Sequence, residues 1–381
     1  MKSSGAWLVA AVLMLPSEAL AERRLSVEPA IDVTEVHDDN LNFSADEPLR
    51  DRIRRITPTL ALRFDSPRWT ARGTYGFDSE RFATHSGLDN PRARERALIR
   101  IQYDGGPRLT LSMDSAYVNT DTPSELNVDT GLAASRVRGR RLGIGSSARF
   151  RISPRLTAMA SASSVTTNVE NGVGIRALVQ TLALERRATL RDRVTLDYEH
   201  SDLVFDGETS QSLNTHAVLV GWTRDLGGRT HLRLRGGPRI TDGSPTADLS
   251  ASLSHDWRFS SMAISLLRSQ TTVVGYVGAV ETQSLQAKFT YVPNRRLTAY
   301  VAPALIRSTH DRLEGTVYRV NLGARYAVTP IVGFDVAYNL DTQKGAIDPL
   351  WADAEFSRAT LSVGFTTRWN SADRRGTGRV R

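Results

Sequence analysis

The sequence predicts an all-β chain: a transmembrane, antiparallel, up-and-down β-barrel of about 18 strands. The first observation is that apolar and polar side chains alternate with a period of two. Within residues 56–78, Leu60, Leu62 and Phe64 share one parity, whereas Ala61 and Arg63 lie between them on the other. Successive side chains of a strand point to opposite faces, so this period indicates strands. The second observation is that short turns and longer polar loops separate these segments alternately, which is typical of a barrel of hairpins.

The composition of the 381 residues supports one closed sheet. There is no cysteine, which excludes a disulfide framework and a thiolate metal site. No segment reaches the roughly 18 apolar residues of a transmembrane helix. The length suggests more than one soluble domain, but no linker or composition shift divides the chain. A barrel is the one β architecture that satisfies every backbone group inside a bilayer.

The two ends predict export and a flexible tail. Residues 1–21 combine Lys2, an apolar run from Ala6 to Leu15 and a small-residue ending, which is the pattern of a secretory signal peptide. We expect the barrel to occupy residues 22–369, with no folded plug before its first strand. Residues 370–381 are polar and basic, so we expect a disordered tail in the periplasm.

The strands follow from the turns in order. Gly, Pro, Asn and Ser mark eight short turns, because these residues supply the dihedral angles that tight turns need; the turns lie near 66–68, 105–107, 153–155, 190–192, 227–228, 259–260, 294–296 and 329–330. Nine longer loops complete the connections, and the third, about residues 119–138, is long enough to fold into the barrel. The predicted strands lie near 25–38, 53–65, 69–79, 95–104, 108–119, 139–152, 156–169, 175–188, 193–205, 213–226, 230–241, 247–258, 262–274, 280–292, 297–309, 316–328, 332–343 and 355–369.

Even strand number and unequal ends indicate the outer membrane of a Gram-negative bacterium, with short turns in the periplasm and longer loops outside. The last strand, which ends at Trp369, resembles the aromatic-ended strand that the barrel-assembly machinery recognises, although twelve residues follow it here. Aromatic side chains near strand ends predict girdles at both boundaries with outer-membrane lipid; they are Trp69, Tyr103, Tyr117, Trp222, Trp257, Phe259, Tyr291, Tyr326 and Trp369.

The polar parity of each strand should line a wet lumen. Its predicted lining residues are Arg63, Arg72, Arg100, Arg149, Arg151, Arg233, Arg235, Arg239, Arg258, Arg319, Arg325, Arg368, Asp114, Asp197 and Glu199, with Asp256 and Asp335 as further acids. Cations outnumber anions in this set, in line with a formal net charge of +8. Rings of one sign give a pore its charge preference, so we expect a net-positive lumen. The alternative is that these arginines pair with the inward acids and stiffen the wall.

The other motifs in the sequence do not indicate an enzyme. Asp38-Asp39-Asn40 offers oxygen ligands for Ca²⁺, but a turn held by Asx hydrogen bonds explains it as well. The segment 143–148, "GIGSSA", lies within a strand and lacks the context of a dinucleotide fingerprint. Asp197 and Glu199 share a parity and could act on a glycan, although wall charges explain them better. We expect no catalytic residue, no metal, no cofactor and no nucleic-acid partner.

The N-terminus carries a family resemblance. "LSVEPAIDVTEVHDDNLNFS" followed by "RDRIRRITPTLALRF" resembles the opening hairpin of the outer-membrane β-barrels associated with exopolysaccharide biosynthesis, through Asp38-Asp39-Asn40 and Pro58. The resemblance implies a conduit that exports an exopolysaccharide together with an inner-membrane copolymerase or a periplasmic export component. A general diffusion porin for small solutes, an adhesive or structural surface barrel, and a polymer hydrolase remain open.

Overall fold

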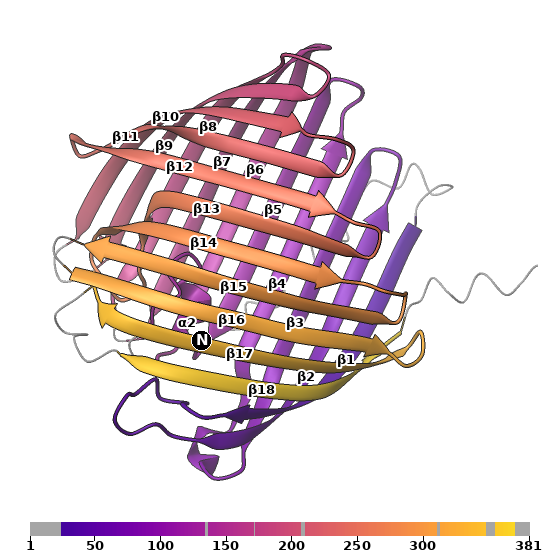
Figure 1. The fold of residues 1–381 in the computed structure, drawn as a ribbon, viewed down its shortest axis with the longest axis vertical. Coiled ribbons are helices and arrows are strands. Elements are labelled where there is room, and N and C mark those ends of the chain that lie inside the picture. Colours follow the sequence, from indigo (N-terminus) through magenta and orange to yellow (C-terminus); the bar gives the residue numbers. More distant parts are fainter. Residues whose placement is uncertain are drawn as a thin grey trace, which may run out of the picture.

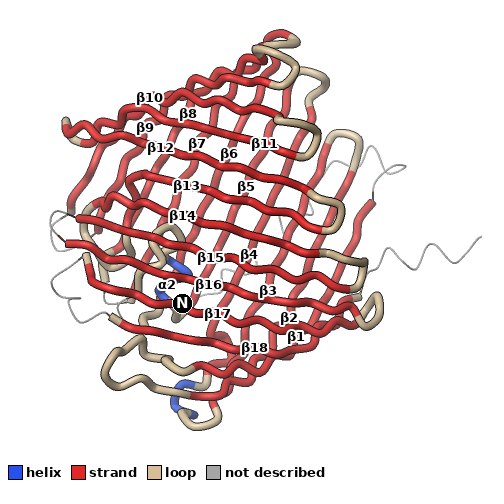
Figure 2. Tube along the Cα trace, in the orientation of Figure 1, coloured by secondary structure: helices blue, strands red, loops and turns tan. Residues whose placement is uncertain are grey.

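The sheet closes on itself. The computed structural model describes residues 24–133, 136–170, 172–206, 210–310, 313–347 and 355–369, and its 18 strands form one antiparallel sheet. Each strand pairs with its neighbours in the chain, and β1 (Arg24–Asp38) also pairs with β18 (Phe356–Arg368). The result is a barrel with very little helix (Figures 1 and 2). The predicted fold class and strand number are confirmed.

The remaining strands match the predicted segments, with ends that differ by a few residues. They are β2 (Asp51–Asp65), β3 (Trp69–Phe82), β4 (Asn90–Asp104), β5 (Leu109–Thr120), β6 (Gly139–Ser153), β7 (Leu156–Val169), β8 (Gly174–Arg187), β9 (Asp192–Asp206), β10 (Gln211–Asp225), β11 (Thr230–Thr241), β12 (Ser244–Asp256), β13 (Ser260–Thr272), β14 (Ala279–Tyr291), β15 (Leu297–His310), β16 (Leu313–Ala327) and β17 (Val332–Ala346). The largest difference is at β4, which begins five residues before its predicted start at 95. The predicted signal peptide and tail lie outside the described residues.

The two ends of the barrel differ, as predicted. All eight predicted short turns lie at one end, here called the short-turn end, together with Arg24. The other, long-loop end holds two short helices, η2 (Ser86–Leu88) and α2 (Pro123–Leu126). One connection there is shorter than expected: Asp242 (φ 45°) and Gly243 (φ 82°) join β11 to β12 in a two-residue turn, the left-handed geometry that favours tight hairpins. Among the described residues, no helix is long and apolar enough to cross a membrane.

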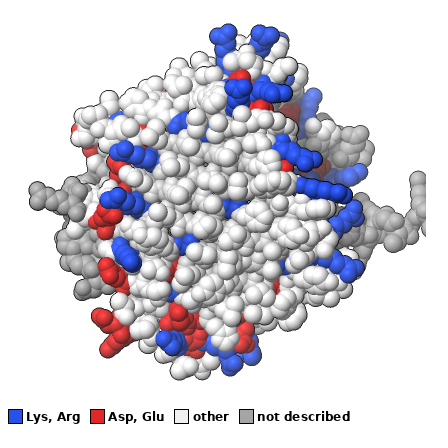
Figure 3. Space-filling model, viewed as in Figure 1, with Lys and Arg blue, Asp and Glu red and all other residues white. Residues whose placement is uncertain are grey.

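The outer face carries an apolar band. Large apolar side chains are exposed on one parity of the strands, for example Leu182, Leu196 and Phe365, and the visible face in Figure 3 is almost free of charge between two charged rims. Trp69 stacks on Tyr103 with ring centroids 4.6 Å apart at the short-turn end. All the predicted girdle residues except Tyr117 lie at this end, so these residues form a girdle at one boundary, and only Tyr117 lies near the other. Even strand number, apolar band and unequal ends are the features of an outer-membrane β-barrel fold.

Polar side chains interrupt this outer face on β8–β10. Tyr198 Oη lies 2.8 Å from His216 Nδ1, and His200 Nε2 lies 3.2 Å from Asp202. The His200 and His216 rings stack with centroids 4.7 Å apart. These contacts lower the cost of placing the groups on an apolar surface, although His200 Nδ1 is buried without a hydrogen-bond partner among the described residues.

Most of the buried apolar residues lie at the long-loop end; Ala217 and Leu219, on the inner face of β10, are exceptions. One cluster contains Leu132, Val273, Val280, Ile306, Val317 and Ile347. Two smaller clusters, around Leu41 and around Phe43, lie beneath the first loop. The core of this protein is therefore a set of contacts that fixes loops to the barrel wall.

Gly237 allows close packing of β10 on β11. A Cβ built at Gly237 would overlap the carbonyl oxygen of Val218. We expect Gly237→Ala to destabilise the folded barrel by about 1–3 kcal/mol, the usual cost of overpacking. The measurement is the guanidinium midpoint of unfolding in lipid vesicles. Gly143→Ala is the control, because its Cβ would meet Val165 Cγ2 at an ordinary 3.7 Å. Equal midpoints for the two variants would contradict this reading of the pairing.

Candidate functional site

The loop between β5 and β6, residues 121–138, crosses the opening at the long-loop end; we call it the mouth loop. Asn127 Oδ1 accepts a hydrogen bond from Val274 N at 2.7 Å, and Asp129 accepts one from Thr271 Oγ1 at 3.3 Å. Both partners belong to the β13–β14 hairpin, which lies about halfway around the barrel from β5. A loop that begins on one wall and binds the opposite one must pass over the lumen. The sequence indicates that this loop is long enough to fold inward, and these contacts show that it does.

Apolar packing and one buried hydrogen bond fix the tip of the mouth loop. Leu132 is 1% exposed and packs on Val280 and Val317 in the cluster described above. The next residue, Ala133, donates its N–H to Gln343 Oε1 in β17 at 2.9 Å. Gln343 is itself 1% exposed, so this contact is shielded from water. The tip is therefore part of the buried core at this end.

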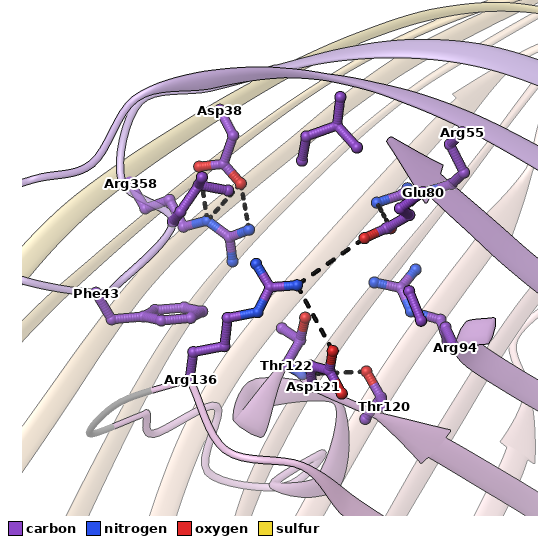
Figure 4. Close-up of a pocket in the computed structure, with 13 residues that line it drawn as sticks. Asp38, Phe43, Arg55, Glu80, Arg94, Thr120, Asp121, Thr122, Arg136 and Arg358 are labelled. Atoms are coloured by element: carbon purple, nitrogen blue, oxygen red, sulfur yellow. Dashed lines mark hydrogen bonds and ion pairs between the residues drawn. The ribbon is translucent and has the colours of Figure 1, made fainter. Parts of the chain in front are cut away.

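Ion pairs hold the near side of the mouth loop. Glu125 accepts from Arg94 Nη2 of β4 at 2.6 Å. Arg136 reaches Asp121 at 3.6 Å and Glu80 of β3 at 4.0 Å, and its guanidinium lies 5.3 Å from the Phe82 ring centroid. Figure 4 shows Arg136 between the loop and the wall, pointing toward both carboxylates. The loop is thus attached to both sides of the barrel.

The first loop is latched beside this network. Asp38, 3% exposed, accepts from Arg358 Nε at 3.0 Å and from the N–H of Asn40 at 3.1 Å. The Arg358 guanidinium lies 4.5 Å from the Phe43 ring centroid. Both Asp38 oxygens serve the arginine, which is the role of an acid in an ion pair. The Asx-held turn, the alternative to a calcium site, is confirmed, but it is buried rather than solvated.

Little space remains among these side chains. A cavity of about 30 Å³ lies between the two loops and the wall, lined by Asp38, Arg55, Glu80, Arg94, Asp121, Arg136 and Arg358 among others. Such a volume holds one or two waters and no larger ligand. This part of the mouth is closed by ion pairs, so any solute must pass elsewhere across the opening.

The ion pairs at this end were not among the residues predicted from the sequence. Asp78, 1% exposed, lies 3.3 Å from Arg94 and 3.0 Å from Arg96, and Arg55 bonds Glu80 at 2.7 Å. A signal was present, because Arg55 and Arg63 share the inward parity of one strand. Arg94, by contrast, lay outside the predicted strand, and its partner Glu125 comes from a loop whose path no local pattern reveals.

The register places all the predicted lumen residues except Arg258 on the inner face. This face is defined by Gln343 and Val317, whose side chains touch the mouth loop inside the barrel. Cross-strand pairs extend the assignment of the inner face from strand to strand around the sheet. The predicted residues on the inner face are Arg63, Arg72, Arg100, Arg149, Arg151, Arg233, Arg235, Arg239, Arg319, Arg325, Arg368, Asp114, Asp197 and Glu199. Asp256 and Asp335 share the face. Arg258 instead lies in the turn after β12, where its guanidinium is 4.9 Å from the Phe259 ring.

Several of these arginines pair with acids, as the wall-stiffening alternative expects. Arg319 Nε lies 2.6 Å from Asp341, and Arg325 Nε lies 2.6 Å from Asp335. Arg239 pairs with Asp248. These pairs join neighbouring strands and cancel charge on their part of the wall.

Asp197 and Glu199 share one cation. Arg235 Nε lies 2.8 Å from Asp197, and its Nη2 lies 3.6 Å from Glu199. A carboxylate bound in this way is a wall charge rather than a free acid or base. The arrangement favours the ion-pair interpretation over glycan hydrolysis.

A different arrangement occurs on β2–β4. Arg63 is the cross-strand partner of Arg72, and Arg72 is the partner of Arg100; we call these three the arginine ladder. All three are exposed although they point inward, so the space in front of them is open. Like charges directly opposite each other on a sheet are destabilising, by about 0.7 kcal/mol for two charges roughly 6 Å apart in water.

Two acids lie beside this ladder: Asp65 next to Arg63, and Asp114, the cross-strand partner of Arg100 on β5. Arg63 lies 2.5 Å from Asp65. Arg72 and Arg100 make no ion pair within the described ranges, and the same holds for Arg149 and Arg151 on β6. This side of the inner wall therefore presents free guanidinium groups to the lumen.

Comparisons with known proteins add little. No family model and no curated protein matches the sequence. Among solved structures, OccK7 (OpdD) of Pseudomonas aeruginosa is 12% identical, with 92% of this chain and 100% of that chain covered and a TM-score of 0.49. OccAB4 of Acinetobacter baumannii is 10% identical, with 92% and 99% covered and a TM-score of 0.48. A mutant of the ferric enterobactin receptor PfeA from P. aeruginosa is 9% identical, with 90% and 80% covered and a TM-score of 0.47. At these TM-scores we draw no argument from the likeness, and the fold rests on the strand pairings above.

Leu132 is the residue that most directly fixes the mouth loop. We expect Leu132→Asp to release the loop tip, because the buried leucine contributes about 2–5 kcal/mol and a carboxylate there has no partner. Trypsin should then cleave after Arg136 faster than in the unaltered protein, and single-channel conductance should rise. Val128→Asp is the control, because Val128 lies in the same loop but is 59% exposed. Equal cleavage rates for both variants would show that the tip is not anchored by this cluster.

Proposed function

We propose that this chain is an outer-membrane diffusion channel for small hydrophilic solutes, with a preference for anions. The observation that carries the proposal is the combination of a mouth loop attached to both walls and a row of exposed, inward arginines behind it. The loop limits the size of what enters, and the arginines select its charge.

An open interior supports the channel role. A closed barrel of about 18 strands is wide enough to leave an aqueous channel unless protein fills it. The ladder arginines are exposed, so none of the described residues fills the lumen at their level. In an outer-membrane orientation the short-turn end faces the periplasm and the mouth loop lies on the extracellular side.

Charge supports the anion preference. Arg63, Arg72 and Arg100 lie side by side, and arginine forks bind carboxylate and phosphate groups in a bidentate manner. A surplus of one sign along a pore favours the opposite ion. Small carboxylates and phosphates are therefore the solutes that this wall suits best.

Export of an acidic exopolysaccharide is the function that the N-terminal resemblance implies, and it would use the same positive wall. The mouth loop argues for smaller solutes, because a polymer would have to pass a loop that is packed at its tip and ion-paired at its base. The adhesive alternative predicts no ion flow at all. The resemblance alone thus supports polymer export.

Charge selectivity is measured as the reversal potential in a planar bilayer with a salt gradient. We expect the unaltered channel to prefer chloride over potassium. Arg72→Gln/Arg100→Gln/Arg149→Gln should lower that preference by at least threefold, because one charge at close range contributes roughly 0.7 kcal/mol, which is a factor of about three.

Arg54→Gln/Arg81→Gln/Arg140→Gln is the matched control for this measurement. These three arginines are also exposed, but they lie on the outer face of β2, β3 and β6 near the long-loop end. Their loss should leave the reversal potential unchanged. A cation preference in the unaltered protein would contradict the proposed selectivity, and absence of conductance would favour the adhesive alternative.

Solute size separates diffusion from polymer export. Proteoliposomes that contain the barrel should swell quickly in monosaccharides and much more slowly in long oligosaccharides, because the mouth loop narrows the entrance. Leu132→Asp should reduce this difference. Equal swelling rates across the size series would favour a wide export conduit.

A further inference from the structure

One residue type recurs at the short-turn end. An arginine immediately precedes the first residue of six strands that begin there: β3, β5, β7, β9, β11 and β15. We call these six residues the arginine rim; they are Arg68, Arg108, Arg155, Arg191, Arg229 and Arg296. None of them was identified as a lumen residue from the sequence: five lie outside the predicted strands, and Arg108 is the first residue of one.

Backbone hydrogen bonds show that the six positions are equivalent. The carbonyl oxygen of Arg68 accepts from Asp104 N at 2.8 Å, that of Arg108 from Arg151 N at 2.8 Å, and that of Arg296 from Ala327 N at 2.7 Å. Arg155, Arg191 and Arg229 accept in the same way from the ends of β8, β10 and β12. Each arginine thus adds one rung to the sheet beyond its strand.

The added rung sets the direction of the side chain. Alternation along a strand continues through it, so Arg68 shares the inward parity of Arg72, and Arg108 that of Asp114. The same parity holds at the other four positions. The arginine rim therefore faces the exit of the lumen, mainly along β3–β11, rather than the lipid boundary.

The rim carries little compensating charge. All six side chains are exposed, and none makes an ion pair within the described residues. Acids at this level have other partners: Asp65 binds Arg63 at 2.5 Å, and Asp225 binds His231 at 2.7 Å. On the face shown in Figure 3, basic side chains gather along the right-hand rim, which is the short-turn end.

Further charged residues belong to the same level. Arg187 and Arg368 end their strands on the inner face, Arg151 lies two residues before the end of β6, and Arg24 begins β1; all four add positive charge. Asp104 accepts hydrogen bonds from Gln102 and Thr110, and Asp256 ends β12. The balance at the exit stays positive.

We propose that the arginine rim is a binding site for a flexible chain that carries several phosphate or carboxylate groups. From β3 to β11, neighbouring rim positions are two strand spacings apart, roughly 10 Å, and Arg296 lies four strands beyond Arg229. These separations are too large for one small anion to bind two arginines unless both side chains bend toward it. A chain with repeated anionic groups binds several at once, and each contact raises the effective concentration for the next. This site is distinct from the arginine ladder, and binding at it does not require passage through the channel.

Calorimetry on the folded full-length barrel in a neutral detergent tests the site. The probes are sodium hexametaphosphate for phosphate groups and a deca-glutamate peptide for carboxylates, with orthophosphate as the single-charge-group reference. We expect the chain-like probes to bind and orthophosphate to bind far more weakly. Arg68→Gln/Arg155→Gln/Arg229→Gln should weaken binding of the preferred probe by about tenfold.

The equivalence of the six positions supplies a second variant. Arg108→Gln/Arg191→Gln/Arg296→Gln should give the same loss, so the test survives if one variant fails to fold, as judged by heat-modifiable gel mobility. Arg54→Gln/Arg81→Gln/Arg140→Gln, with three outer arginines removed from the opposite end, should bind like the unaltered protein. Unchanged affinity in a folded rim variant, or an equal loss in the outer control, would overturn the proposal. Neither result would bear on channel selectivity, which is measured with chloride.

Discussion

Closure of the sheet between β1 and β18 is the constraint on which the rest of the structure depends. Nine residue pairs, from Ala30 with Arg368 to Asp38 with Thr360, join the first and last strands. In a bilayer, an open edge would leave unpaired backbone groups without water. Closure also brings the first loop beside the end of the chain, where Asn40 Nδ2 donates to the Ser357 carbonyl at 3.0 Å. The latch formed by Asp38 and Arg358 lies on this seam, so the same event closes the wall and builds part of the mouth.

Arginines on the inner wall have two different kinds of cross-strand partner in different parts of the barrel. Where arginines face acids across a strand pair, as Arg319 faces Asp341, the charges cancel and the pair strengthens the wall. Where arginines face arginines, as on β2–β4, the pairing costs stability. A sequence that retains such a repulsion in an open space gives up stability for a positive potential. The ladder is therefore the part of the wall least explained by folding alone.

The strands could be predicted from the sequence because their signal is local. Alternation within about ten residues and a turn residue at each end sufficed for all 18. Arg258 was misplaced because Trp257 and Phe259 continue the alternation of β12 through the turn. The apolar cluster that holds the tip of the mouth loop could not be predicted, since Leu132, Val280 and Ile347 meet only when distant strands are in place. The sequence shows the arginine rim as an arginine that repeatedly precedes a strand. The direction of these side chains, however, depends on the extra backbone hydrogen bond that continues the strand register.

The two openings differ in how their arginines are used. At the long-loop end Arg94, Arg136 and Arg358 are bound to acids, so that mouth is nearly neutral and rigid. At the short-turn end the rim arginines are unpaired among the described residues, and water surrounds them. The exit is positive and the entrance is nearly neutral. The electrostatic energy of an anion therefore falls as it moves from the mouth loop toward the short turns. Screening confines this potential to about 10 Å at 0.1 M salt, which is why the ladder and the rim act at separate levels rather than as one field.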